Sequence, residues 1–243
     1  MNPANRQPPS LPDDMRIYVI SDIHGCADLL DRALAAIDAD IAKGRPDRLL
    51  HIMLGDYIDR GADTRLTLDV LLARSRRYPS VYLKGNHEDV LLGFLRDPGR
   101  LQDWRQFGGL QTLISYGLKP SLHPDAGEQL ELARDFAAAL PPEHKRLLEG
   151  LKPSYACGDY FFCHAGVRPG VALSEQREED LLWIRDEFLN SDSDFGKFII
   201  HGHTPVRQPD LRANRLNIDT GAYATGRLTV LRMEGITLEF LDI

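Results

Sequence analysis

Five apolar runs of this chain each end in a short string of polar residues, and this arrangement constrains the fold more than any other feature. The strings combine aspartate, asparagine or histidine with nearby glycine: Asp22-Ile-His24, Gly55-Asp56-Tyr-Ile-Asp59-Arg60-Gly61, Gly85-Asn86-His87-Glu88, His164-Ala-Gly166 and His201-Gly202-His203-Thr204. The runs before them are typical of buried strands: Ile17–Ile20, Leu49–Leu54, Val81–Leu83, Tyr160–Cys163 and Phe198–Ile200. Open α/β sheets bind ligands at the carboxyl ends of their strands, so we expect the five strings to lie close together.

Helical periodicity separates the first three runs. Apolar residues recur at helical spacing from Leu29 to Ile41, and again within Thr64–Ser75. The order strand–helix–strand–helix–strand predicts a parallel sheet with right-handed crossovers. The last part of the chain turns to short apolar runs that predict a second sheet: Phe198–Ile200, Leu216–Ile218, Arg227–Met233 and Ile236–Leu241.

These elements predict an α/β fold, an α/β/β/α sandwich of two mixed sheets flanked by helices. We expect a single domain over residues 15–243, preceded by a disordered tail over residues 1–14 that is rich in proline and poor in apolar side chains. Residues 91–155 carry none of the five strings and are mostly helical by pattern. They predict a helical insertion beside the site that shapes the substrate groove.

Composition excludes several classes of protein. The chain has 243 residues and a net charge of −7, which argues against a general nucleic-acid binder. We find no apolar run of the roughly 18 residues that a membrane span needs, and the first residues lack the apolar region of a signal peptide. Cys26, Cys157 and Cys163 share no zinc-binding spacing and indicate a reducing compartment. We therefore expect a cytoplasmic protein that binds neither nucleic acid nor membranes.

The donor atoms in the strings indicate a metal site. Carboxylate, amide and imidazole groups together suit a divalent first-row metal better than magnesium or calcium alone. Their number is sufficient for two metal ions that share one carboxylate. A single histidine at a strand end is more often structural, and Gly-Asp is a common turn dipeptide. Five such strings in order, at regular strand–helix spacing, are difficult to explain by turn chemistry.

The ordered strings resemble the calcineurin-like metallophosphoesterases, and among them the phosphoprotein phosphatases. Leu83-Lys84-Gly85-Asn86-His87-Glu88 matches the characteristic string of serine/threonine protein phosphatases at every position. The bacteriophage lambda protein phosphatase and its bacterial relatives are similar from about Met15 to the C-terminus. They share four further strings with this chain: Trp104-x-x-x-Gly108-Gly109, Phe162-Cys163-His164-Ala165, Gly202-His203-Thr204-Pro205 and Ile218-Asp219-Thr220-Gly221-Ala222.

The resemblance implies a centre of two divalent metal ions. The residues in the family's ligand positions are Asp22 and His24 for the first metal, Asp56 between the two metals, and Asn86, His164 and His203 for the second. The wider superfamily has another histidine where this chain has Pro205, and the phosphatase branch also lacks it. His201 does not occupy a ligand position, so we expect a structural or supporting role for it. The donor set favours manganese, with iron and zinc as alternatives.

Four further residues are expected to bind the phosphate or to assist departure of the leaving group. Arg60 is placed to bind it bidentately, and Arg185 resembles the family's second phosphate-binding arginine, although a solvated helix position would also explain it. His87 lies one residue past a ligand position and is expected to protonate the leaving alkoxide. Asp59 would accept a hydrogen bond from this imidazole and raise its pKa. A hydroxide shared by the two metals would be the nucleophile, because no Cys-x5-Arg loop indicates a covalent route.

These observations lead to three functional hypotheses. The leading one is a metal-dependent phosphatase that hydrolyses phosphoserine and phosphothreonine in a protein or peptide partner. The alternative is a hydrolase of dinucleoside polyphosphates such as bis(5'-nucleosyl) tetraphosphate, which uses the same metal site. A non-catalytic scaffold is the third, and the presence of all six ligand positions argues against it. The Trp104 string favours the first hypothesis without deciding it, because specificity depends on the insertion.

Overall fold

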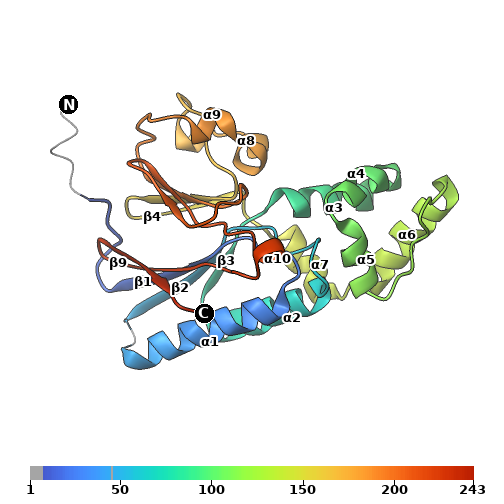
Figure 1. Cartoon of the computed structure of the whole chain (residues 1–243), viewed down its shortest axis with the longest axis horizontal. Coiled ribbons are helices and arrows are strands. Elements are labelled where there is room, and N and C mark those ends of the chain that lie inside the picture. The colour runs from blue at the N-terminus through green and yellow to red at the C-terminus, as the bar shows by residue number, and fades with distance from the viewer. Residues whose placement is uncertain (1–7, 45) are drawn as a thin grey trace.

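Two five-stranded sheets stack face to face, with helices on the outer face of each (Figure 1). This arrangement is seen in a computed structural model that describes residues 8–44 and 46–243. Side chains of Ile17 and Val19 from one sheet pack with Phe162 and Ile200 from the other in a core between the sheets. The predicted α/β/β/α sandwich of two mixed sheets is confirmed.

The first sheet carries the first three polar strings. Its strand order is β10-β9-β1-β2-β3, in which β1, β2 and β3 are parallel and β9 and β10 are antiparallel to their neighbours. Each parallel strand therefore delivers the following string to the same edge. The strands are β1 (Met15–Ile20), β2 (Arg48–Met53), β3 (Ser80–Tyr82), β9 (Val230–Glu234) and β10 (Thr237–Leu241). The expectation that the runs Arg227–Met233 and Ile236–Leu241 belong to the second sheet is wrong: they form β9 and β10, and β9 pairs with β1. Pairing between strands so far apart in the chain is non-local, so the apolar runs alone do not indicate which sheet they join.

The second sheet carries the last two strings. Its order is β4-β5-β6-β8-β7, with β5, β6 and β8 parallel to one another and the outer strands antiparallel. The strands are β4 (Ser154–Cys157), β5 (Tyr160–Cys163), β6 (Phe198–His201), β7 (Asp210–Leu211) and β8 (Arg215–Asn217).

Helices cover the outer faces of both sheets. The predicted crossover helices are α1 (Ala27–Lys43) and α2 (Thr64–Arg77), and their apolar residues pack on the first sheet. On the second sheet, Leu181 and Phe188 of α8 (Glu178–Trp183) and α9 (Asp186–Leu189) pack against Ile199. Among the helices that the structure describes, none combines the length and apolar character needed to cross a membrane.

A group of helices extends to one side of the sandwich (Figure 1). The expected insertion, residues 91–155, begins within the first of these helices and ends within β4. Trp104, Phe94 and Phe136 are its largest fully buried side chains, and they join the core that also holds the residues of α1 and α2. The helices are α3 (Asn86–Arg96), α4 (Leu101–Gln106), α5 (Gly109–Ser115), α6 (Ala126–Ala139) and α7 (Pro142–Glu149).

The segment before β1 differs from the expectation of a disordered tail over residues 1–14. Residues 1–7 lie outside the described part of the chain, but residues 8–14 pack on the sandwich. The backbone N–H of Ser10 donates to Asp159 at 3.0 Å, and that of Leu11 donates to the Gly235 carbonyl at 2.9 Å. The Leu11 side chain is buried in the core between the sheets, which supplies the apolar contact that proline content alone did not reveal.

Candidate metal centre

The predicted site residues gather where the parallel strands of both sheets end. Asp22, His164 and Asp59 lie behind the surface of a cavity at this edge, within contact of residues that line it. Seven of the ten predicted residues line the cavity itself: His24, Asp56, Arg60, Asn86, His87, Arg185 and His203. The two halves of the chain therefore contribute to one site.

Donor atoms of His24 and Asp56 approach one another on one side of the cavity. The Nε2 atom of His24 lies 3.5 Å from Asp56 Oδ2. The Nδ1 atom of His24 lies 2.9 Å from the Ile58 carbonyl, so this nitrogen is the donor and Nε2 keeps its lone pair. Ligand atoms of His24, Asp56 and His87 lie within 4.8 Å of one another, close enough to hold a metal ion. Asp22 is nearby and accepts the backbone N–H of His203 at 3.1 Å.

A second group of donors shares Asp56 with the first. Ligand atoms of Asp56, His164 and His203 also lie within 4.8 Å of one another. Asn86 Oδ1 is 2.9 Å from both His164 Nε2 and His203 Nδ1. Because His164 Nδ1 is 3.0 Å from the Leu54 carbonyl, its Nε2 also presents a lone pair towards Asn86. The lone pairs of His164 Nε2 and Asn86 Oδ1 would repel each other at 2.9 Å, and a cation bound to both atoms would remove this repulsion.

The electrostatics of the two groups also fit metal ions. Burial, together with the charges of Asp22 and Glu88, raises the pKa of Asp56 well above its usual range. Burial lowers the pKa of His164, and it lowers that of His203 further with the help of the neighbouring His164. The imidazoles are thus held neutral, the form that binds metals, and divalent cations would offset the repulsion among the carboxylates. The residues fit two metal ions that share Asp56.

Backbone strain is concentrated at this centre. Among the described residues, six that are not glycine have positive φ angles, and only Asp14 lies outside the predicted site. Left-handed backbone is unfavourable for residues with a Cβ atom, and such strain clusters at functional sites. The other five are His24 (φ 48°), Asp56 (φ 52°), Asp59 (φ 69°), Arg60 (φ 64°) and His203 (φ 67°).

Glu88 holds the loop that carries Asp56 in place, a role that the sequence analysis missed. Its buried carboxylate accepts the backbone N–H groups of Asp56, Tyr57 and Gly85 at 3.0, 2.8 and 2.9 Å. The bond from Gly85 is the signal that could have revealed this role, because an acidic residue three positions into a helix commonly accepts the N-cap N–H. Glu88 therefore joins the second and third polar strings.

The predicted acid pair, His87 and Asp59, is tied to the helical insertion. His87 Nδ1 lies 2.8 Å from Asp59 Oδ2. The same carboxylate accepts a bond from the indole N–H of Trp104 at 3.0 Å and from the Thr112 hydroxyl at 2.6 Å. We predicted neither contact: the Trp104 string was recognised only through its family resemblance, and Thr112 lies in a helix without a distinguishing pattern. The insertion thus positions the carboxylate that orients His87.

The pKa of His87 differs from the expectation. Burial, followed by the charges of Arg60 and His164, lowers the pKa of His87 to about 3 instead of raising it. Burial raises the pKa of Asp59 to about 7, although Thr112, Trp104 and Arg60 act in the opposite direction. For both groups burial is the largest cause of the shift in pKa, and the sequence could not show this burial. His87 is therefore neutral at rest and would have to gain a proton before it donates one.

The two glycines of the Trp104 string allow the insertion to approach the site. Gly108 has φ 91°, and its carbonyl accepts the backbone N–H of Arg60 at 3.2 Å. A Cβ atom on Gly108 would lie 2.8 Å from the Arg60 nitrogen, and one on Gly109 would lie 2.5 Å from the Trp104 ring. The Trp104 string therefore brings the insertion into contact with both Asp59 and Arg60. These contacts account for the spacing between Trp104 and the two glycines.

His201 does not belong to either group of possible metal ligands. It is fully buried at the end of β6, with Nδ1 3.1 Å from the Gly202 carbonyl. Its ring lies edge-on to Phe188 of α9, with the centroids 5.0 Å apart. The contact with Phe188 belongs to the packing between the second sheet and its helices.

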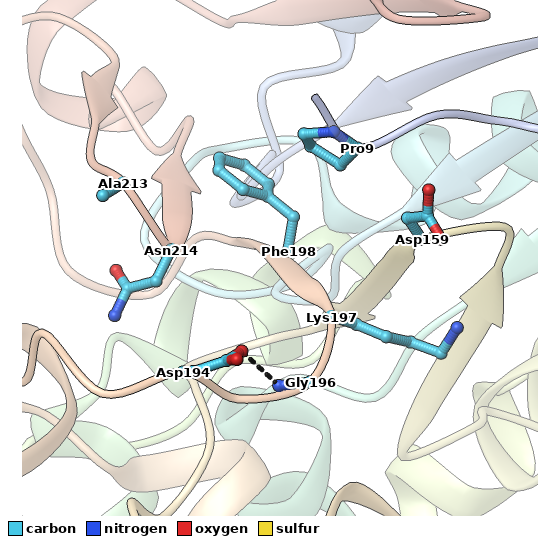
Figure 2. Close-up of a pocket in the computed structure, with 8 residues that line it drawn as sticks. All are labelled: Pro9, Asp159, Asp194, Gly196, Lys197, Phe198, Ala213 and Asn214. Carbon is cyan, nitrogen blue, oxygen red and sulfur yellow. Dashed lines mark hydrogen bonds between the residues drawn. The ribbon is translucent and has the colours of Figure 1, made fainter. Parts of the chain in front are cut away.

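A second cavity lies at the opposite end of the second sheet, before the strands that lead to the site (Figure 2). Three of its polar side chains already form hydrogen bonds with other residues of the chain. Asp159 accepts bonds from Ser10, Lys197 Nζ donates to the Gly158 carbonyl at 2.5 Å, and Asn214 donates to the carbonyls of Ser191 and Ser193. This cavity therefore offers a ligand few free polar partners.

Comparison with known proteins agrees with the geometry of the centre. The sequence matches the model of the calcineurin-like phosphoesterases over residues 15–232. The chain belongs to this family. It is similar to bis(5'-nucleosyl)-tetraphosphatase PrpE (asymmetrical) of Geobacillus sp. strain WCH70, with 28% identity over 238 residues and 90% of each chain covered.

Solved structures share the fold of this phosphoesterase. A proposed diadenosine tetraphosphatase has a TM-score of 0.63 and 18% identity, with 93% of this chain and 92% of that chain covered. The cold-active protein-tyrosine phosphatase of a psychrophilic Shewanella sp. has a TM-score of 0.57 and 17% identity, with 96% and 83% covered. At these identities the likeness concerns the fold alone.

Proposed function

We propose that this phosphoesterase hydrolyses bis(5'-nucleosyl) tetraphosphates asymmetrically, into a nucleoside triphosphate and a nucleoside monophosphate. The observation that carries the reaction class is the position of Asp56 between His24 on one side and His164 and His203 on the other. Arg60 and Arg185 line the same cavity. The substrate is supported by the Geobacillus relative, which carries this name and matches 90% of both chains. We thus prefer the dinucleoside polyphosphate as substrate over the phosphoprotein that the Leu83–Glu88 string favours.

The proposed ligands are those of the sequence analysis, with Asp22, His24 and Asp56 on one side and Asn86, His164 and His203 on the other. When bound, two metal ions would polarise phosphoryl oxygens and activate water at neutral pH. We propose manganese as the metal, with iron and zinc as alternatives, because the imidazoles favour transition metals.

The chain's own residues would bind and protonate the substrate. Arg60 and Arg185 would hold phosphoryl oxygens, whose negative charge is spread over equatorial positions in the transition state. His87 Nε2 lies 3.7 Å from Asp56 Oδ2, on the side of the cavity that would hold the phosphate, while Nδ1 lies 2.8 Å from Asp59. Since His87 is neutral at rest, it would take up a proton from solvent water and pass it to the leaving oxygen, while the attacking water would release a proton to solvent.

Phosphoserine and phosphothreonine hydrolysis is the second candidate. The match of Leu83–Glu88 to serine/threonine protein phosphatases favours it, because these residues supply the proposed ligand Asn86 and the proposed acid His87. The same residues would serve either substrate, so the two candidates differ in what binds beyond the phosphate.

A direct comparison of substrates tests the proposal. Manganese-loaded protein is assayed for kcat/KM on diadenosine tetraphosphate and on a phosphoserine peptide, and the nucleotide products are separated by chromatography. We expect the nucleotide to be preferred, with ATP and AMP in equal amounts. Preference for the peptide would support the second candidate, and two molecules of ADP would contradict asymmetric cleavage. Full activity in a metal-stripped sample, checked by elemental analysis, would contradict the two-metal centre.

A further inference from the structure

An exposed aromatic side chain lies at the edge of the metal cavity. Tyr223 belongs to the short helix α10 (Ala222–Thr225), which follows the Asp219 turn, and 44% of its surface is exposed. It lines the same cavity as His24 and Arg60. The cavity is lined mostly by polar side chains, with Phe107 and Pro205 beside them, so the Tyr223 ring contributes a partly exposed aromatic surface next to the proposed phosphate-binding residues.

The position of this ring is fixed by two proposed site residues. The Arg60 guanidinium lies over the Tyr223 ring, with Cζ 4.6 Å from the centroid. The His24 ring is edge-on to it, with the centroids 5.3 Å apart. The tyrosine is thus adjacent to the guanidinium that would bind a phosphoryl group, and it retains a large exposed area.

Two other aromatic residues near the cavity are less available. Phe107 packs edge-on against both His87 and Trp183, at 5.5 and 5.6 Å between centroids. Both Phe107 and Trp183 are only partly exposed, and they pack against the core that contains the insertion. Tyr223 is therefore the aromatic side chain of the cavity with the most surface left for a substrate.

We propose that Tyr223 and the adjacent Arg60 form a subsite that stacks a nucleobase of the substrate. Every nucleobase has a planar π face, and stacking on aromatic rings or arginine planes binds bases with little dependence on their identity. A base joined through ribose to a phosphate held by Arg60 would lie near this ring. A phosphoserine side chain carries no such ring. The subsite rests on the proposed function, because it assigns the part of the nucleotide that lies beyond the phosphates.

Substitution of Tyr223 tests the subsite through substrate selectivity. For Tyr223→Leu, which keeps apolar bulk but removes the π face, we expect kcat/KM on diadenosine tetraphosphate to fall about tenfold more than on para-nitrophenyl phosphate. Tyr223→Phe is expected to keep the wild-type ratio of the two activities. Phe240→Ala is the matched control, since Phe240 is 49% exposed on β10 and does not line this cavity.

A binding measurement separates the subsite from the proposed reaction. ATP and tripolyphosphate carry the same phosphate chain, and only ATP has a base. We expect ATP to bind the manganese-loaded wild type more tightly by calorimetry, and Tyr223→Leu to remove most of this difference. If the wild type does not hydrolyse diadenosine tetraphosphate but still shows the Tyr223-dependent preference for ATP, the proposed function is wrong and the subsite stands.

Two outcomes would overturn the subsite. Equal losses on both substrates in Tyr223→Leu would mean that Tyr223 acts by holding Arg60 or His24. Equal affinity of the wild type for ATP and tripolyphosphate would mean that no base is bound. Metal content is measured for each variant, so that a loss of metal through His24 is recognised.

Discussion

His203 and His201 lie two positions apart, and the structure gives them different surroundings. His203 Nδ1 is 3.1 Å from His164 Nε2 and 2.9 Å from Asn86 Oδ1, among the proposed metal ligands. His201 instead contacts Phe188 on the other side of the second sheet. The backbone at His203 is left-handed, which turns its side chain towards the cavity after the strand ends.

This difference predicts opposite effects of two alanine substitutions. His203→Ala should bring the metal content to about one ion per chain and reduce activity by more than about 100-fold, the upper end of the effect of losing an outer-shell partner. His201→Ala should keep both metals, although the cavity it leaves should lower stability. Elemental analysis of the purified variants measures the metal content. A loss of metal in His201→Ala with both ions kept in His203→Ala would reverse the two assignments.

The sequence predicted the metal-binding and phosphate-binding residues better than the residues that hold them in place. Metal-binding and phosphate-binding residues follow strands, so their strings could be recognised by type and order. The contacts of Thr112 and Trp104 with Asp59 join positions 53 and 45 residues apart, and their hydrogen-bonding partners depend on how the insertion packs. The low pKa of His87 also depends on burial, which composition and spacing do not report.

The proposed role of His87 predicts an effect that depends on the leaving group. A general acid contributes roughly 10²–10⁴-fold when the leaving group is basic. His87→Asn should therefore slow hydrolysis of a phosphoserine peptide far more than that of para-nitrophenyl phosphate, whose phenolate leaves without a proton. Thr112→Val should show the same bias in weaker form, because it removes one donor to Asp59. Steady-state rates with both metals bound measure the bias, and equal losses would indicate a role in phosphate binding or metal geometry.

Short elements were the least predictable parts of the fold. β7 has two residues, and it exists through its pairing with β8. β4 is a sheet edge with mixed burial, so its sequence shows no alternation. α8 and α9 have six and four residues, too few for a helical period, yet they flank Arg185. Tertiary contacts that are distant in sequence stabilise these elements.

One such contact joins the two short helices on either side of Arg185. Arg168 donates to Asp180 of α8 through Nε at 2.9 Å, and to Glu187 of α9 through Nη1 at 2.8 Å. Bidentate contacts of this kind fix geometry as well as charge. Arg168 therefore holds the ends of the segment that presents Arg185 to the cavity.

We expect Arg168→Met to raise KM by roughly three- to tenfold with little change in kcat, because misplacing a substrate-binding arginine weakens phosphate binding. Arg168→Lys should restore part of the affinity, since it keeps one of the charged contacts. Arg177→Met is the matched control, because it removes an exposed pair between the residue before α8 and Glu179 of α8. A fall in kcat without a change in KM would show that Arg168 does not act through substrate binding.

At the scale of the whole molecule, stability depends on buried groups in several layers. The layered architecture could be predicted from the two sets of strands, but the stacking of the sheets is non-local and fixes which polar groups are buried. His51 in β2 is fully buried, and its Nδ1 accepts a bond from Arg74 Nε of α2 at 3.2 Å. Arg74 in turn binds Asp38 of α1 at 2.7 Å. This network connects the first sheet to both of its helices.

The network predicts that His51 destabilises the protein in acid. Burial and the charge of Arg74 lower the pKa of His51 to about 3, below the value of about 6.5 expected in the unfolded chain. As pH falls from about 6.5 towards 3, the unfolded state binds a proton that the folded state does not, so the free energy of unfolding decreases by up to about 1.4 kcal/mol per pH unit from this residue. Above pH 6.5 the effect is absent.

His51→Gln keeps an acceptor for Arg74 without titrating, so the free energy of unfolding of this variant should depend less on pH between 6.5 and 4. Urea unfolding of the metal-stripped wild type and variant measures the difference, and His123→Gln in an exposed loop controls for the substitution. Identical pH dependence in His51→Gln and the wild type would mean that His51 is already charged in the folded protein.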